Sequence, residues 1–355
     1  STDYGGSGRA YTVLSINTLA FTVAFAAWMT YGVLITFLVD NGEYDWDKAQ
    51  IGWLIGVPVL TGSLMRLPAG LLTDKYGGRP VFTIFLLVAA MPMFLVSYAD
   101  SFLGFMLAGL GFGLTGATFA VGIAFSSIWF PRERQGFTLG IFGAGNAGAA
   151  ITSMLAPPLL KSLTDDGADI DEWRMLPKIY AIALAITATL FFLLTKSRKV
   201  EGHAGHTLGQ RLRPLFYIRV WRFGLYYFLV FGGFVALAQW LIPYYVNVYT
   251  MSLASAGLMA SIFTLPSGVI RALGGWISDR FGARSVMYGV LGFCAIGLIL
   301  LSVPRMDIQS PGEGIVAARS GTVTSVTSEE IVVDDRSYAL TPMDALDEFD
   351  PDANL

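Results

Sequence analysis

Two arginines stand inside long apolar stretches of this chain, where a charged side chain is costly. Arg66 and Arg271 each precede by eight positions an aspartate, Asp74 or Asp279, that closes the stretch. If the stretches are membrane helices, a rise of about 1.5 Å per residue puts each guanidinium roughly 12 Å below the membrane surface. An arginine at that depth costs about 2.5–3.5 kcal/mol on insertion scales and normally faces a cavity or a partner.

The apolar stretches contain no carboxylate that could neutralise Arg66 or Arg271. Guanidinium groups bind planar oxyanions through paired hydrogen bonds, so two of them at equivalent depth predict an anion-binding site. The alternative is that both side chains reach along the helix to the phospholipid headgroups, as long basic side chains often do. We favour the anion site because the two arginines occupy equivalent places in a repeat.

The surroundings of the two arginines form an internal repeat with an offset of 205 positions (271 minus 66). The first copy comprises Arg66, Gly70, Asp74, Lys75, Tyr76, Gly77 and Arg79, and the second Arg271, Gly275, Asp279, Arg280, Phe281, Gly282 and Arg284. Such a repeat indicates two homologous bundles related by an axis along the membrane normal. The glycines are predicted to let helices approach closely, and the aspartates to cap a neighbouring helix or to pair with basic residues. A gating role is therefore predicted for Gly70, Asp74, Arg79, Gly275, Asp279 and Arg284.

A third polar group, Asn146, lies in a run of small residues, Gly140–Ala150. The glycines of this run are typical of close helix packing. Packing does not explain the amide, which needs a hydrogen-bond partner in apolar surroundings. The partner is predicted to be a neighbouring helix or a bound oxyanion, and we favour the oxyanion.

The composition excludes a soluble protein and disfavours an enzyme. Hydrophobic residues make up 54% of the chain and charged residues 14%, against about 25% charged residues in soluble domains. Cys294 is the only cysteine, and the two histidines, His203 and His206, lie in a polar stretch. We therefore predict no disulfide, no metal site and no cofactor. The sequence also lacks a phosphate-binding loop, and nothing in it indicates nucleic-acid binding.

Nine apolar runs are long enough to be membrane helices, because a bilayer core of about 30 Å needs roughly 20 apolar residues. They are Val13–Val39, Ile51–Leu72, Val81–Tyr98, Leu103–Phe130, Phe137–Leu160, Ile179–Leu194, Phe223–Val248, Ala254–Ile277 and Val286–Val303. Basic residues gather in the loops of one side, as in Lys196–Arg222, and acidic residues in those of the other, as in Asp40–Asp47. Because positive loops stay cytoplasmic, we predict a multi-pass inner-membrane protein with a cytoplasmic N-terminus.

The order of the spans predicts an all-α polytopic membrane protein with four parts. These are a six-helix bundle (1–195), a cytoplasmic linker (196–222), the first three helices of a second bundle (223–303) and an acidic segment outside the cytoplasm (304–355). The acidic segment has candidate strands at Ile315–Ala318, Thr322–Val326 and Ile331–Val333. If the second bundle also had six helices, helices ten to twelve would be absent from this chain; a genuine nine-span protein is the alternative.

These motifs resemble those of a known family. The repeated loop Gly70–Arg79 is similar to the loop signature of the major facilitator superfamily, whose fold consists of two six-helix bundles. Gly145-Asn146-Ala147-Gly148 resembles the glycine-rich signature that the nitrate/nitrite porters of that superfamily carry in their fifth span. Phe130–Gly136 and Phe231–Phe234 also look like that family. The resemblance covers Tyr11–Val303 and departs from the family in lacking the last three helices.

The resemblance implies six anion-binding residues drawn from both halves. Arg66 and Arg271 would clamp the anion. Asn146 and Tyr227 would add hydrogen bonds, and Phe119 and Phe231 would sandwich the plane of the anion. For the three aromatic residues, core packing or contact with lipid is the alternative.

We expect a monomeric transporter that exchanges nitrate for nitrite across the lipid bilayer by rocking one bundle against the other. Without an anion, repulsion between the two arginines would oppose closure, so only the loaded carrier would switch. Exchange is favoured over proton symport because the spans contain neither histidine nor a buried carboxylate. The alternatives are a porter for another small anion, a nitrate/proton symporter, and a membrane sensor that binds the anion without transporting it.

Overall fold

The computed structural model describes residues 8–165, 168–196 and 208–302, together with three strands beyond them. Within these residues eight helical segments are long and apolar enough to cross a membrane. They are Gly8–Asp40, Lys48–Tyr76, Gly78–Tyr98, Phe102–Ser127, Arg132–Leu163, Ile170–Leu194, Ile218–Tyr249 and Leu253–Phe281. These eight match the first eight predicted spans. The ninth prediction corresponds to α15 (Ala283–Ser302), which has a shorter apolar stretch.

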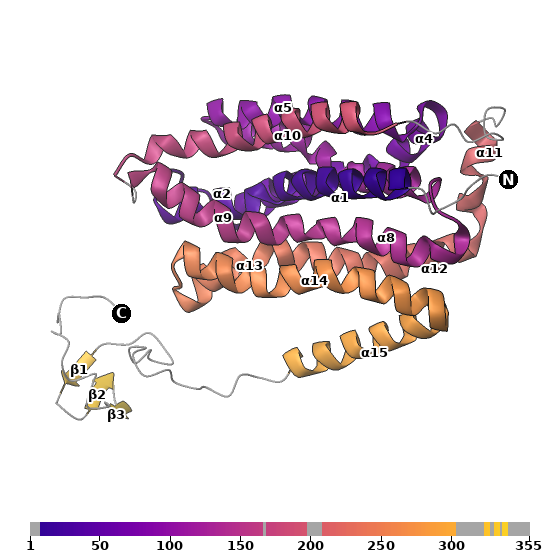
Figure 1. The fold of residues 1–355 in the computed structure, drawn as a ribbon. Coiled ribbons are helices and arrows are strands. Elements are labelled where there is room, and N and C mark those ends of the chain that lie inside the picture. Colours follow the sequence, from indigo (N-terminus) through magenta and orange to yellow (C-terminus); the bar gives the residue numbers. More distant parts are fainter. Residues whose placement is uncertain are drawn as a thin grey trace. The chain divides into compact units, whose positions relative to one another are not determined.

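Most spans consist of more than one helical element (Figure 1). The first four comprise α1 (Gly8–Trp28), α2 (Thr30–Asp40), α3 (Lys48–Leu64), α4 (Arg66–Tyr76), α5 (Gly78–Leu95), η1 (Val96–Tyr98), α6 (Phe102–Phe112), η2 (Gly113–Ala117) and α7 (Thr118–Ser127). The next two comprise η3 (Arg132–Arg134), α8 (Gln135–Gly143), η4 (Ala144–Ala147), α9 (Gly148–Leu163), η6 (Ile170–Arg174) and α10 (Met175–Leu194). The last elements are α11 (Leu208–Leu212), η7 (Arg213–Phe216), α12 (Ile218–Tyr227), η8 (Phe228–Gly232), α13 (Gly233–Tyr249) and α14 (Leu253–Phe281).

The chain divides into two compact units, one ending at Leu291 and the other beginning at Gly292. The predicted division into bundles and a linker stays a prediction. Residues 197–207 of the predicted linker, with both histidines, lie outside the described residues. The rest of that linker contains α11, η7 and the start of α12.

Helix α1 lies at the centre of the first unit, between α5 and α10 on one side and α8 and α9 on the other (Figure 1). Helix α14 runs along α8, η4 and α9, and α13 lies against α2. The eighth span is therefore joined to the first six along the fifth span, and the seventh is joined to them through α2 of the first span.

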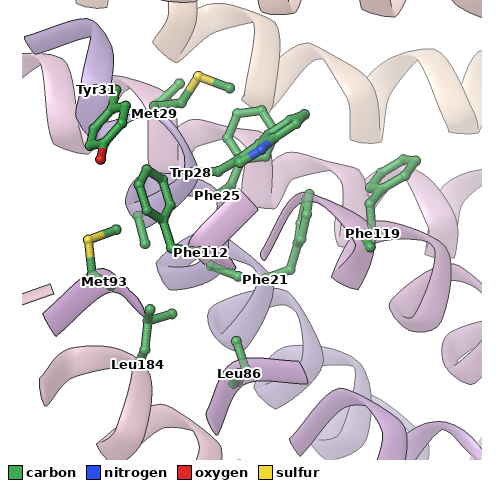
Figure 2. Packing of buried hydrophobic residues seen from close by; sticks show 14 of the residues in the cluster. Phe21, Phe25, Trp28, Met29, Tyr31, Leu86, Met93, Phe112, Phe119 and Leu184 are labelled. Carbon is green, nitrogen blue, oxygen red and sulfur yellow. The ribbon is translucent and has the colours of Figure 1, made fainter. Parts of the chain in front are cut away.

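Trp28 marks the break between α1 and α2 and lies in a core of large aromatic side chains (Figure 2). Its indole Nε1 donates to the carbonyl of Pro58 at 2.8 Å. Gly62 and Gly116 leave the space that the ring occupies, because a Cβ at either position would overlap it. Two glycines from different spans thus leave room for a large side chain, whose ring lies 5.9 Å from the guanidinium carbon of Arg66 at the break in the second span.

Close contact between α8 and α14 depends on glycine. A Cβ on Gly275 would overlap the carbonyl oxygen of Gly136, and a Cβ on Gly140 would lie 2.5 Å from the carbonyl oxygen of Arg271. The two backbones can approach this closely only where both helices lack side chains. This contact determines how far α14 carries Arg271 towards the fifth span.

The second unit contains a three-stranded antiparallel sheet in the order β1 (Val323–Val326), β2 (Glu330–Val333) and β3 (Arg336–Ala339). The predicted strands Thr322–Val326 and Ile331–Val333 coincide with β1 and β2. The third strand follows β2 directly and was not predicted. The candidate Ile315–Ala318 lies outside the described residues.

Gly275→Ala is expected to lower the stability of the protein by about 1–3 kcal/mol, because the added methyl group overpacks the contact with α8. The measurement is thermal unfolding in detergent. Gly274→Ala is the matched control, because no atom lies within 4 Å of its Cβ position, and alanine favours the helix over glycine. Equal unfolding midpoints for the two variants would show that the close contact does not hold the helices together.

Candidate anion-binding site

Arg66 lies at the break between α3 and α4, directly after Met65. Its Nη1 donates to the hydroxyl of Tyr227 at 3.3 Å. Its Nε and Nη2 are buried and have no hydrogen-bond partner among the described residues. Buried donors of a charged group are costly when they have no acceptor, so Arg66 has two donors that could still bond to an acceptor.

Arg271 lies in α14 and is held by Asn146 of η4. An arginine has only donors, so the amide of Asn146 turns its oxygen toward the guanidinium. In that orientation the oxygen accepts from Nη1 at 3.0 Å, from Nε at 3.2 Å and from Nη2 at 2.6 Å. The amide is fully buried. The partner of Asn146 in this structure is therefore a neighbouring helix.

Phe231 connects the two arginines. The guanidinium carbon of Arg66 lies 4.8 Å from the centre of its ring, and that of Arg271 lies 5.3 Å away. Arg66 also lies 5.3 Å from the ring of Phe119. Contacts of this kind stabilise a cation by roughly 0.5–2 kcal/mol. These contacts lower the cost of two like charges in one apolar region, but they neutralise neither charge.

The aromatic rings stack on one another. Phe231 lies 5.6 Å from Phe119 with 14° between the planes, and 4.8 Å from Tyr227 with 16° between the planes. The two rings predicted to sandwich an anion are thus in contact here. An anion between them would require the rings to move apart.

Irregular helical turns place these side chains. Arg66 follows a break, Asn146 lies in the 3-10 turn η4, and Phe231 lies in the π-helical segment η8. Phe119 lies just after another 3-10 turn, η2. A π-helical segment shifts the register of the side chains that follow it and occurs frequently at functional sites. All six residues predicted to bind the anion thus lie in one region of the first unit.

A cavity of about 410 Å³ opens beside Arg66 and Tyr227. Besides these, its wall includes Trp28, Ser63 and Gln239, none of which was predicted from the sequence. Gln239 had a signal in the sequence, because it is an amide within an apolar span, which it shares with Asn247. Trp28 and Ser63 had none, because neither residue type is unusual at such a place.

Of the residues predicted to gate in the second repeat copy, Gly275 and Asp279 make contacts between the spans. The carboxylate of Asp279 accepts from the backbone N–H of Gly136 at 3.0 Å and of Phe137 at 2.8 Å. These are free N–H groups of the first turn of α8, so Asp279 caps that helix and faces the positive end of its dipole. Arg284 donates to the hydroxyl of Tyr288 at 3.0 Å, within α15.

The residues predicted to gate in the first copy have different surroundings. No atom lies within 4 Å of the Cβ position of Gly70, so the predicted close approach is present at Gly275 and not here. Asp74 makes no hydrogen bond to any described residue. Arg79 donates from Nε to the carbonyl of Phe192 in α10 at 2.8 Å. The two copies therefore share a sequence pattern but differ in what they contact.

The chain belongs to the Major Facilitator Superfamily, whose family model matches residues 18–321. This is a family of membrane transporters and not of enzymes. The fold agrees, because a bacterial homologue of the human lysosomal transporter Spinster, in an inward-facing and occupied conformation, superposes with a TM-score of 0.58. The two chains are 19% identical, and the match covers 79% of this chain and 63% of that one.

Within the superfamily, sequence relatives carry names of one kind, and the resemblance seen in the sequence is confirmed. A probable nitrate/nitrite antiporter, NarK1 of Thermus thermophilus, is 42% identical over 83% of this chain and 67% of its own length. The nitrite extrusion protein of Bacillus subtilis is 30% identical over 88% of this chain and 77% of its own. A probable nitrate transporter, NarT of Staphylococcus epidermidis, is 31% identical over 83% and 73%.

Asn146→Leu is expected to destabilise the protein by about 1–3 kcal/mol, because the buried guanidinium of Arg271 loses its acceptor. Thermal unfolding in detergent measures the effect. The control is the double variant Asn146→Leu/Arg271→Met, which removes both partners and should recover much of the loss. The destabilisation of the double variant is compared with the summed effects of Asn146→Leu and Arg271→Met alone. If the two values were equal, the two side chains would not be coupled.

Proposed function

We propose that this chain exchanges nitrate and nitrite across a membrane, with the anion held between Arg66 and Arg271. The observation that carries the proposal is the free capacity of Arg66. Two of its buried donors lack an acceptor among the described residues, while a second guanidinium lies against the same Phe231 ring. The names of the sequence relatives support nitrate and nitrite as the anions.

Charge and shape both favour a small planar monoanion. A nitrate or nitrite ion would cancel one of the two positive charges and accept the free donors of Arg66 in a bidentate arrangement. Tyr227 lies next to these donors through its bond to Nη1 and would add a hydrogen bond. Asn146 would add another from its amide nitrogen while its oxygen stays on Arg271. Phe119 and Phe231 would enclose the plane of the anion after their rings, which are stacked here, had moved apart.

Exchange follows from the same charges. In the empty carrier the two guanidinium groups repel each other, and Asn146, being neutral, satisfies hydrogen bonds without removing charge. Bringing the halves together around a dry site is therefore favourable only with an anion bound. The carrier would return across the membrane loaded, with nitrate in one direction and nitrite in the other.

The moving bodies would be residues 1–195 and 223–303, joined by the linker 196–222. The cap that Asp279 forms on α8 and the glycine contact beside it would hold one end closed. The basic loops at that end, which include Arg132 and Arg134, would face the cytoplasm with the N-terminus. We further propose that the protein acts as a monomer in the lipid bilayer of the inner membrane.

Nitrate uptake into proteoliposomes tests the proposal. The wild-type chain is expected to take up nitrate when the vesicles contain nitrite and to show little uptake into empty vesicles. Arg66→Lys and Arg271→Lys should each reduce exchange by roughly ten- to a hundredfold, because lysine keeps the charge but loses the fork. Arg174→Lys is the matched control, because this arginine lies away from the site. It forms an ion pair with Asp100, with 2.7 Å between Nη2 and Oδ1.

Three results would contradict the proposal. Equal uptake into empty and nitrite-loaded vesicles would exclude exchange. Uptake driven by a proton gradient without internal anion would indicate symport. Full exchange in both arginine variants would show that Arg66 and Arg271 have a structural role and do not clamp the anion.

A further inference from the structure

The two arginines differ in their availability to a ligand. The oxygen of Asn146 already lies within hydrogen-bond distance of Nε, Nη1 and Nη2 of Arg271. Arg66 instead keeps two donors without a partner among the described residues, and it lines the cavity of about 410 Å³. An anion arriving through that cavity would therefore meet Arg66 before Arg271.

The same cavity has a second polar group whose hydrogen bonds are incomplete. Gln239 of α13 is buried, with 2% of its surface exposed, and lines the cavity. Its Nε2 donates to the carbonyl of Trp28 at 3.5 Å, the outer limit for such a bond, and its Oε1 has no partner among the described residues. A primary amide has two N–H groups, so at least one donor of Gln239 remains free.

The packing around Gln239 leaves specific room for its amide. A Cβ on Gly32 of α2 would lie 2.6 Å from Oε1 and 2.9 Å from the backbone oxygen of Gln239. Glycine at position 32 is thus required for the amide to lie where it does. The short distance to the backbone oxygen shows that Gly32 also lets α2 and α13 approach closely.

Gln239 stands between one end of the span and the arginines. It follows Phe231 by eight residues, which corresponds to about 12 Å along a helix. Trp28 joins the two places, because its carbonyl accepts from Gln239 and its ring lies 5.9 Å from the guanidinium carbon of Arg66. The cavity therefore has a neutral donor towards the Tyr249 end of α13 and a charged pair of donors at Arg66.

We propose that this cavity holds a vestibule subsite for a monovalent oxyanion, in which Gln239 donates a hydrogen bond to the anion before it reaches Arg66 and then Arg271. The inference rests on the proposed function and adds a place and an order of binding to it. A neutral amide suits this place, because it replaces part of the hydration shell without holding the anion strongly. The final step brings the anion to Arg271, whose donors it shares with Asn146.

Two variants change the subsite without touching the arginines. Gln239→Leu removes the donor, and Gly32→Ala displaces the amide from the opposite side. Asn247→Leu is the matched control, because this amide lies on the same helix, bonds the carbonyl of Pro243 at 2.7 Å and does not line the cavity. The full chain is used for nitrate–nitrite exchange in proteoliposomes and for calorimetric titration with nitrate in detergent.

Gln239→Leu and Gly32→Ala should each raise the KM for nitrate and its dissociation constant by about two- to tenfold, the effect of one neutral hydrogen bond. The maximal exchange rate should stay within about twofold of the wild type, because the transition between conformations does not use the subsite. Asn247→Leu should change neither constant. Unchanged KM and dissociation constant in Gln239→Leu, or a fall in maximal rate at constant KM, would overturn the inference.

Failure of the proposed function would be recognised separately. If the wild-type chain bound nitrate but exchanged none, exchange would be rejected, and the subsite would still be judged by the titration. Weaker nitrate binding by Gln239→Leu would then support it, and unchanged binding would reject it.

Discussion

Two guanidinium groups beside one phenylalanine ring are the constraint on which the rest of this structure depends. Arg66 and Arg271 come from different spans and lie 4.8 and 5.3 Å from the centre of Phe231. No ion pair to either arginine is found in the described part of the chain. The ring contacts and the amide of Asn146 compensate for lost hydration but not for like charge, so both positive charges stay uncompensated among the described residues.

Three of the spans that carry these side chains are not regular α-helices. The second, fifth and seventh spans each depart from the α-helix at the turn that carries Arg66, Asn146 or Phe231. Such departures weaken backbone hydrogen bonding, and the protein compensates with close packing nearby. Glycines let α14 lie against α8, and Asp279 caps the helix that precedes Asn146. Arg271 and Asn146 meet because these contacts fix the two helices at short range.

Much of the fold and part of the site could be predicted from the sequence. Arg66, Arg271 and Asn146 were identifiable because polar groups within apolar spans are rare and need a reason. The spans were identifiable because each needs a long apolar run. The breaks within them were not, because a π-helical turn or a helix break results from packing between spans and leaves little trace in local composition.

The unequal surroundings of the repeat copies were also beyond sequence analysis. Gly70 and Gly275 occupy equivalent positions, yet only Gly275 lies against another backbone. Asp279 finds two N–H groups of α8, whereas Asp74 has no such partner among the described residues. Gln239 is an amide in an apolar span, but its contacts with Gly32 and Trp28, which lie far away in the sequence, are visible only in the fold.

The central claim is that one anion contacts both guanidinium groups, and solid-state NMR tests it most directly. Dipolar recoupling between ¹⁵N-nitrate and arginine labelled with ¹³C at Cζ, in the full chain in lipid, detects pairs separated by about 4 Å, the distance that charge-assisted hydrogen bonds impose. The account predicts that two Cζ signals respond to nitrate, one lost in Arg66→Lys and the other in Arg271→Lys. Nitrate contacts that persist unchanged in both variants, or a complete lack of any recoupled Cζ signal, would contradict it.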